Sequence, residues 1–289
     1  MSSTIDAARR DVTISVVQFN ARDDDKSGNV ERACALLEQA GERGTDLAVL
    51  PEVWTGTALA LGNSNELAEP IPGPVTERLA GIAARHSMMI VGSFYEAAFS
   101  RVYNTAPIIG RDGSIVTKYR KTHLFDPAER PDLPTYRESD KITPGESLCV
   151  VDTHFGRIGV AICSDIRFPE IFLTYARAGA ELVILPSAFP ARADHWEFLN
   201  RTRATDNQFF MVSSGMVGRL EHSPITFVGR SMVVDPWGVI VAQASDVEGL
   251  LTTTVDLNSV RVVRTWWDLN SQRRPELYDG AALQSSATT

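Results

Sequence analysis

Residues 158–170 read IGVAICSDIRFPE, an apolar run that meets a cysteine and then a helix-prone segment. The run up to Ile162 is typical of a buried strand, and Cys163 stands where that strand ends. A strand that stops at a nucleophile and turns into a helix directs the side chain into a cleft, beside unpaired backbone N–H groups. Such donors and the helix dipole lower a thiol pKa and hold an oxyanion. For a lone cysteine, however, a small buried hydrophobe is the favoured interpretation, and the rest of the sequence must overturn it.

Short β-rich runs alternate with amphipathic stretches on both sides of this segment. Strands are predicted at 12–19, 47–50, 88–94, 102–109, 148–152, 157–162, 182–186, 209–213, 231–235 and 249–255, and helices at 29–43, 76–86 and 196–207. Residues 111–114 are predicted to form a hairpin turn. This order predicts a mixed, layered α/β fold.

Composition indicates one large globular domain. The chain has 289 residues, 44% hydrophobic and 22% charged, and no Gly/Ser- or Pro-rich linker divides it. We expect a flexible N-terminus at 1–11, a single domain at 12–265 and a C-terminal tail at 266–289.

The net charge of −8 is spread along the chain, and no basic patch predicts a nucleic-acid partner. The acidic run at 23–25 is interpreted as a solvated turn. The apolar runs are too short to span a bilayer, and residues 1–11 do not resemble a signal peptide. We therefore expect no membrane partner and a cytoplasmic location.

The cysteines Cys34, Cys149 and Cys163 form no close pair, so no disulfide framework is expected. No zinc-binding spacing is present, and the sequence predicts neither a metal nor a cofactor.

Two charged residues also follow predicted strands. Glu52 comes directly after the strand at 47–50, at an edge where α/β sheets bind ligands, and its apolar neighbours suit a desolvated general base. Lys121 leaves a strand within a short basic cluster. Taken alone, a capping glutamate and a surface lysine are the more ordinary interpretations.

Three ordered motifs resemble those of the nitrilase superfamily of carbon–nitrogen hydrolases. They are Pro51-Glu52, the run YRKTHLF at 119–125 and the run CSDIRFPE at 163–170. The resemblance continues through LPSAF at 185–189, HWE at 195–197, DPWG at 235–238 and ELY at 276–278, and covers roughly residues 12–280.

The resemblance implies a four-layer αββα sandwich with Glu52 as general base, Cys163 as nucleophile and Lys121 as the cation that stabilises the tetrahedral intermediate. Lys121 and the Ser164 backbone N–H would bind the oxyanion. Glu138 matches a second glutamate of the family, which orients the lysine, although a plain salt bridge is an equal alternative. No histidine is needed, so His123 and His195 are expected to be structural.

Three further residues are expected near the substrate. Arg167 either binds a substrate carboxylate or anchors the turn after the nucleophile through Asp165, and the structural role is favoured. Ala188 and Phe189 are predicted substrate-binding residues, because they lie in the motif at 185–189.

The residues of these motifs most resemble those of the ω-amidase-like and deaminated-glutathione-amidase-like branch, whose members hydrolyse small primary amides bearing a carboxylate. Ser164 replaces the aromatic residue usual after the nucleophile, and Arg230 replaces a common histidine. Hydrolysis of an N-carbamoyl amine remains open, and nitrile cleavage is less expected.

Two alternatives belong to other classes of function, a catalytically silent binding protein and an acyltransferase on the same fold. Retention of Glu52, Lys121 and Cys163 argues against silence, and family acyltransferases usually carry membrane spans. The tail holds Trp266, Trp267 and Tyr278, and family members pair two sandwiches, so a homodimer or higher homo-oligomer is expected.

Overall fold

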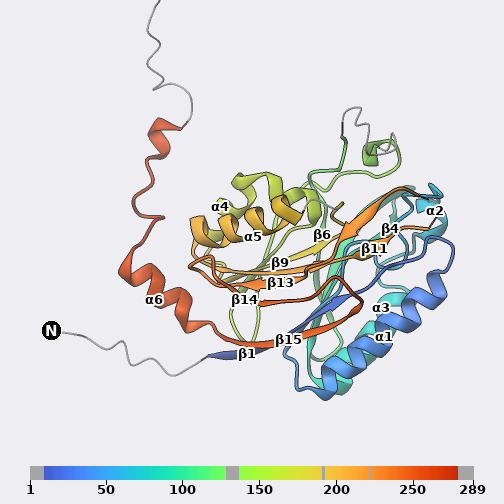
Figure 1. The fold of residues 1–289 in the computed structure, drawn as a ribbon, viewed down its shortest axis with the longest axis horizontal. Coiled ribbons are helices and arrows are strands. Elements are labelled where there is room, and N and C mark those ends of the chain that lie inside the picture. The colour runs from blue at the N-terminus through green and yellow to red at the C-terminus, as the bar shows by residue number, and fades with distance from the viewer. Residues whose placement is uncertain (1–9, 128–136, 191–192, 222, 279–289) are drawn as a thin grey trace, which may run out of the picture.

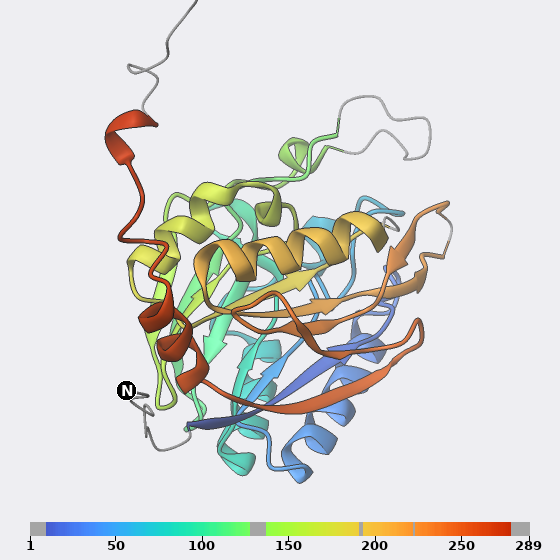
Figure 2. The same cartoon turned by 60° about the vertical axis from the view of Figure 1, so that its left-hand side comes forward.

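Two β-sheets packed face to face form the centre of the molecule, and helices cover the outer face of each sheet (Figure 1). The computed structural model describes residues 10–127, 137–190, 193–221 and 223–278. Helices α1 and α3 lie on one outer face, and α4 and α5 lie on the other (Figure 2). The chain is therefore an αββα sandwich, as the family resemblance implies.

The first sheet has seven strands in the order β15-β1-β2-β3-β5-β4, with β6 paired to β5. Its strands are β1 (Asp11–Gln18), β2 (Leu47–Val49), β3 (Met89–Val91), β4 (Phe94–Ala98), β5 (Arg101–Ile109), β6 (Ile115–Arg120) and β15 (Gly249–Asp256). The predicted turn at 111–114 joins β5 and β6, which pair antiparallel.

The second sheet has six strands in the order β14-β13-β10-β9-β8-β7. Its strands are β7 (Cys149–Asp152), β8 (Arg157–Val160), β9 (Leu182–Ser187), β10 (Phe210–Gly215), β13 (Met232–Val234) and β14 (Ile240–Gln243). A small separate pair consists of β11 (Val217–Arg219) and β12 (Thr226–Val228).

The helices are α1 (Lys26–Glu42), α2 (Ser64–Leu67), α3 (Pro74–His86), α4 (Pro169–Arg177), α5 (Ala193–Asn207) and α6 (Asn258–Trp266), with 3₁₀ turns η1 (Glu138–Asp140), η2 (Cys163–Arg167) and η3 (Pro275–Leu277). No helix in the described part of the chain is long and apolar enough to cross a membrane.

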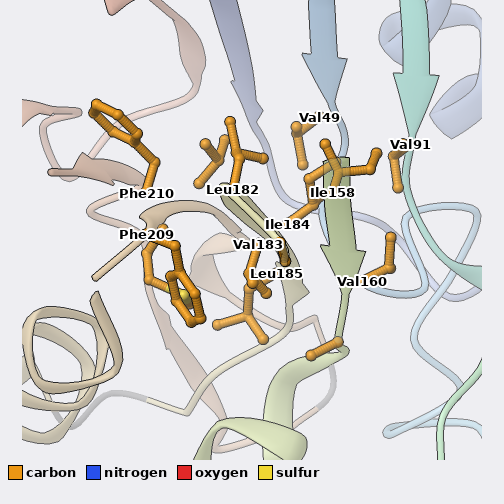
Figure 3. Close-up of a cluster of buried hydrophobic side chains, with 14 of the residues drawn as sticks. Val49, Val91, Ile158, Val160, Leu182, Val183, Ile184, Leu185, Phe209 and Phe210 are labelled. Carbon is orange, nitrogen blue, oxygen red and sulfur yellow. The ribbon is translucent and has the colours of Figure 1, made fainter. Parts of the chain in front are cut away.

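Strand alternation divides the apolar residues between two cores. On β2, Val49 joins the cluster between the sheets, which also contains Ile158 and Val160 of β8 (Figure 3). Its neighbour Ala48 points the other way, into the cluster under α1 and α3. Residues 182–185 of β9 are all buried, because this central strand is covered on both faces. The ends of β2 and β8 are thereby brought to the same edge of the sandwich.

Several predicted elements have different bounds in the structure, and two of the differences have a clear physical reason. The first helix begins at Lys26 rather than at residue 29, because the Asp25 side chain accepts a hydrogen bond from the N–H of Gly28 and caps it. The strand predicted at 88–94 is two strands, β3 and β4, separated at Gly92, where an added Cβ would lie 2.4 Å from the Cβ of Leu50. This close approach of two chain segments requires glycine.

The interpretation of residues 23–25 as a solvated turn is wrong for Asp23. Its side chain is buried, with 5% of its surface exposed, and it accepts hydrogen bonds from the segment that follows β2. Asp24 is exposed, as expected.

Helix α6 was not predicted, because it is short and contains several valines, which have a low helix propensity. It buries Val260 and Val263, and Arg264 donates to the carbonyl of Ala180 at 2.7 Å. Beyond α6, Gln208 donates to the carbonyl of Trp267, and the described residues up to 278 then lead away from the sandwich (Figure 1). The domain limits at 11/12 and 265/266 stay a prediction, and residues 1–9 and 279–289 lie outside the described residues.

Candidate active site

Cys163 stands at the junction between β8 and the 3₁₀ turn η2, which leads into α4. Its φ of 44° lies in the left-handed region, which is uncommon for a residue with a side chain. Its side chain is buried, with 5% exposed. A strained backbone at a strand end is a frequent feature of catalytic positions, provided that its surroundings fix it.

Asp165 fixes this turn. Its buried carboxylate accepts hydrogen bonds from the N–H of Ile162 at 2.8 Å and the hydroxyl of Tyr119 at 2.8 Å. It also accepts one from the N–H of His123 at 3.1 Å, and the His123 ring lies 3.0 Å away through Nδ1. His123 stacks on Phe168, so its structural role is supported.

Glu52 leaves the end of β2 and reaches across to the second sheet. Its Oε2 accepts the N–H of Ala188, just after β9, at 2.8 Å. Its Oε1 accepts a hydrogen bond from the Lys121 ammonium at 2.8 Å. The carboxylate is 4% exposed, so these contacts are made out of water.

Lys121 follows β6 and lies between two carboxylates. Its Nζ is 2.8 Å from Oε1 of Glu52 and 2.7 Å from Oε2 of Glu138. Glu138 opens η1, and its Oε2 also accepts the N–H of Phe125 at 2.7 Å. Both residues are buried, so the Lys121–Glu138 pair belongs to the interior and is not a surface salt bridge.

Asn104 is a member of the cluster that the sequence did not reveal. It lies on β5, and its carbonyl accepts the N–H of Lys121 at 2.9 Å. Its Nδ2 donates to Glu52 at 2.9 Å and to Glu138 at 3.2 Å, so it bridges the same two carboxylates as the lysine. The only signal in the sequence is a polar residue within a largely apolar strand.

These side chains line one pocket with Cys163. The pocket holds about 550 Å³ of empty space including its open mouth, and its other lining residues are Val53, Thr57, Leu59, Tyr95, Phe125, Ala188, Pro190 and Ile225. Glu52 and Lys121 follow strands of the first sheet, Glu138 lies on η1, and the thiol follows a strand of the second sheet. The pocket therefore combines a nucleophile, two carboxylates and one ammonium with a largely apolar wall.

Burial and nearby charges shift the pKa values of Lys121 and Cys163 in different ways. Burial by itself lowers the pKa of Lys121, but the charges of Glu138 and Glu52 outweigh it and raise that pKa well above its usual value. Burial and the Glu52 carboxylate raise the pKa of the Cys163 thiol, although Lys121 lowers it. The expectation of a lowered thiol pKa is therefore wrong, because the thiol is removed from water and lies near the Glu52 carboxylate.

Of the remaining predicted site residues, Ala188 and Ser164 lie at the pocket or beside the nucleophile, whereas Arg167 and Phe189 do not line the pocket. Ala188 lines the pocket and binds Glu52 through its N–H. Ser164 is buried beside the nucleophile, with its hydroxyl donating to the carbonyl of His123. Arg167 is exposed and lies 5.2 Å over the Phe189 ring, and the described lining of the pocket contains neither of them. Asp165, rather than Arg167, anchors the turn.

Comparison with known proteins gives one consistent result. The family model of carbon–nitrogen hydrolases matches residues 13–265. Omega-amidase NIT2 of Bos taurus is 36% identical over 263 residues, which are 90% of this chain and 94% of that protein. Deaminated glutathione amidase of Bos taurus is 38% identical over 263 residues, with 88% and 80% covered.

A solved structure supports the same assignment. Saccharomyces cerevisiae Nit3, a member of branch 10 of the nitrilase superfamily, superposes with a TM-score of 0.81 at 31% identity. The match covers 93% of this chain and 99% of the yeast chain.

Proposed function

Because this chain belongs to the carbon–nitrogen hydrolase family, we propose that it hydrolyses small aliphatic amides through an acyl-thioester on Cys163. The chain is a hydrolase of carbon–nitrogen bonds other than peptide bonds. The observation that carries the catalytic roles is the convergence of Glu52, Lys121 and Glu138 on the pocket that contains the thiol.

In the first half of the reaction, the sulfur of Cys163 attacks the amide carbon while Glu52 accepts the thiol proton. The electrons of the carbonyl π bond move to its oxygen, which the Lys121 ammonium and the Ser164 N–H stabilise. The raised pKa of the thiol fits this order, because a neutral thiol needs a base at the moment of attack. Collapse of the intermediate breaks the C–N bond, and Glu52 returns the proton so that ammonia leaves.

In the second half, water attacks the thioester carbon and Glu52 accepts one of its protons. Collapse of this intermediate breaks the C–S bond and gives the carboxylic acid, and the proton on Glu52 restores the thiol. Glu138 positions the ammonium of Lys121 between the two carboxylates throughout, at 2.7 Å. No metal or cofactor takes part in this scheme.

We infer that the substrate is the ω-amide of a small carboxylic acid. The support is the similarity to proteins named omega-amidase and deaminated glutathione amidase. The largely apolar lining around the thiol is suited to the aliphatic part of such a substrate.

The test is ammonia release from a panel of ω-amides, unsubstituted aliphatic amides, N-carbamoyl amines and nitriles. We expect turnover of amides by the wild type and none above background by Cys163→Ala. Cys34→Ala is the matched control, because Cys34 is buried on α1 away from the pocket and should retain full activity. Equal ammonia release by wild type and Cys163→Ala from every compound would refute the catalytic proposal.

We also propose that two copies of the chain pair through the face formed by α5 and the ends of α6 and β13. Phe198, Trp237 and Trp266 are 66%, 47% and 70% exposed on this face, and the two tryptophan rings lie 6.4 Å apart. Exposed aromatic side chains in such a cluster mark protein interfaces. The cytoplasmic location stays a prediction.

A further inference from the structure

The segment that follows Glu52 forms one wall of the pocket under conformational strain. Val53, Thr57 and Leu59 all line the pocket. Val53 has a φ of 41° and Ala58 a φ of 58°, both in the left-handed region. A β-branched residue such as Val53 rarely adopts this conformation, so the segment keeps its shape only where other groups hold it.

Asp23 holds this segment from outside the pocket. Its Oδ1 accepts hydrogen bonds from both the N–H and the hydroxyl of Thr57 at 2.6 Å, and its Oδ2 accepts the N–H of Ala60 at 2.9 Å. The two carboxylate oxygens therefore bind the backbone on either side of Leu59. These hydrogen bonds join residues more than 30 positions apart in the sequence, and they are buried or partly buried.

A second contact holds the same segment from the pocket side. Tyr95 donates its hydroxyl to the carbonyl of Thr57 at 2.6 Å, and its ring also lines the pocket. The Thr57 peptide is thus fixed at its N–H by Asp23 and at its carbonyl by Tyr95. Leu59 itself is only half-buried, so neighbouring packing does not hold it alone.

We propose that Asp23 is a positioning residue that sets the length of the acyl group accepted by the pocket, by fixing Leu59 in the wall. This inference rests on the proposed amidase function. When ammonia is the leaving group, everything beyond the reacting carbon is the acyl group, and its apolar chain would contact apolar lining residues such as Leu59 and Ile225. A movable Leu59 would make room for longer acyl groups.

The experiment compares kcat/KM for propionamide and hexanamide in wild type and variants. We expect the preference for propionamide to fall by about tenfold in Asp23→Ala, the scale of one or two methylene contacts in an apolar pocket. The propionamide preference of Asp23→Asn should lie between those of wild type and Asp23→Ala. The amide oxygen of the new side chain still accepts hydrogen bonds from Thr57, while its NH₂ group faces the N–H of Ala60. In both variants kcat for propionamide should stay within about twofold of wild type, since the reacting groups are unchanged.

Two further variants separate positioning from a general loss of structure. Asp24→Ala is the matched control, because this neighbouring carboxylate is exposed, and its chain-length preference should equal that of wild type. Leu59→Ala should lower the preference as Asp23→Ala does. Because both act on the same wall, the double variant should show less than the sum of the two effects.

An unchanged propionamide preference in Asp23→Asn, or fully additive effects of Asp23→Ala and Leu59→Ala, would overturn the proposal. If Asp23→Ala does not fold, the propionamide preferences of Asp23→Asn, Leu59→Ala and their double variant test the proposal instead. A wild type that hydrolyses neither these two amides nor any ω-amide points instead to failure of the proposed function, and the two failures are thereby distinguished. If only ω-amides react, succinamate and adipamate replace propionamide and hexanamide in the same comparison.

Discussion

At Cys163, two charged neighbours act on the thiol in opposite directions. Burial raises its pKa most strongly, the Glu52 carboxylate raises it further, and the Lys121 ammonium lowers it. The sum is a thiol that stays protonated at neutral pH. Proton transfer to Glu52 therefore accompanies attack, which differs from a site that stores a preformed thiolate beside a histidine cation.

This balance predicts that Glu52→Gln changes turnover and thiol reactivity in opposite directions. Loss of the base should lower kcat by about two orders of magnitude or more. Removal of the negative charge should also lower the thiol pKa, so that alkylation of Cys163 by a small uncharged reagent becomes faster at any pH below the wild-type pKa. Stopped-time alkylation between pH 6 and 10, followed by mass of the Cys163 peptide, measures this.

The same measurement contains its control. Cys149, whose pKa burial raises to about 11, lies away from the carboxylates and should be alkylated equally in wild type and Glu52→Gln. Slower alkylation of Cys163 in the variant would mean that Glu52 does not oppose thiolate formation, and the account of the raised thiol pKa would fail.

At the scale of elements, the position of the thiol depends on how β8 packs against α4. Gly159 lies on β8 against the ring of Tyr175, where an added Cβ would come within 2.7 Å of the ring. The Tyr175 hydroxyl donates to the carbonyl of Val160 at 2.5 Å, three residues before the nucleophile. The glycine therefore allows α4 to approach the strand that carries Cys163.

Gly159→Ala is expected to lower the free energy of unfolding by about 1–3 kcal/mol, the usual cost of overpacking a core. Gly81→Ala is the matched control, because no atom lies within 4 Å of its added Cβ and it stands inside α3. That substitution should stabilise by about 0.5–1 kcal/mol through helix propensity. Denaturant unfolding measures both, and equal stability of the two variants would contradict the packing account.

The elements that the sequence predicted best are those with a clear period or cap. The proposed catalytic residues that the sequence indicated are those at strand ends. Glu52, Lys121 and Cys163 follow β2, β6 and β8. Asn104 and Asp23 were missed for a physical reason. Each acts through hydrogen bonds to residues distant in sequence, and neither a mid-strand amide nor an acidic run carries a local mark of burial.

At the scale of the molecule, the site exists only where the two sheets meet. The first sheet supplies Glu52 and Lys121, and the second supplies Cys163 and the N–H of Ala188, which binds Glu52 directly. The apolar cluster between the sheets thus sets the distance from base to nucleophile. Motifs separated by many residues in the sequence predicted the members of the site, whereas their contacts follow from sheet packing.

The proposed pairing of two sandwiches predicts a mass of twice 31.7 kDa by light scattering at micromolar concentration. Phe198→Asp should shift the protein toward the monomer, because it buries a charge in the proposed interface. Phe99→Asp is the control, since Phe99 is 85% exposed at the β4–β5 turn, outside this face, and should leave the mass unchanged. A monomeric, fully active wild type would contradict the pairing.

The central claim is an acyl-thioester on Cys163, and partitioning between water and hydroxylamine tests it most directly. An amide and an ester with the same acyl group must pass through the same acyl-enzyme, although they release different leaving groups. At fixed hydroxylamine concentration we predict one ratio of hydroxamate to acid from both substrates, and no enzymatic product with Cys163→Ala. Ratios that depend on the leaving group, or products formed equally by Cys163→Ala, would contradict the account.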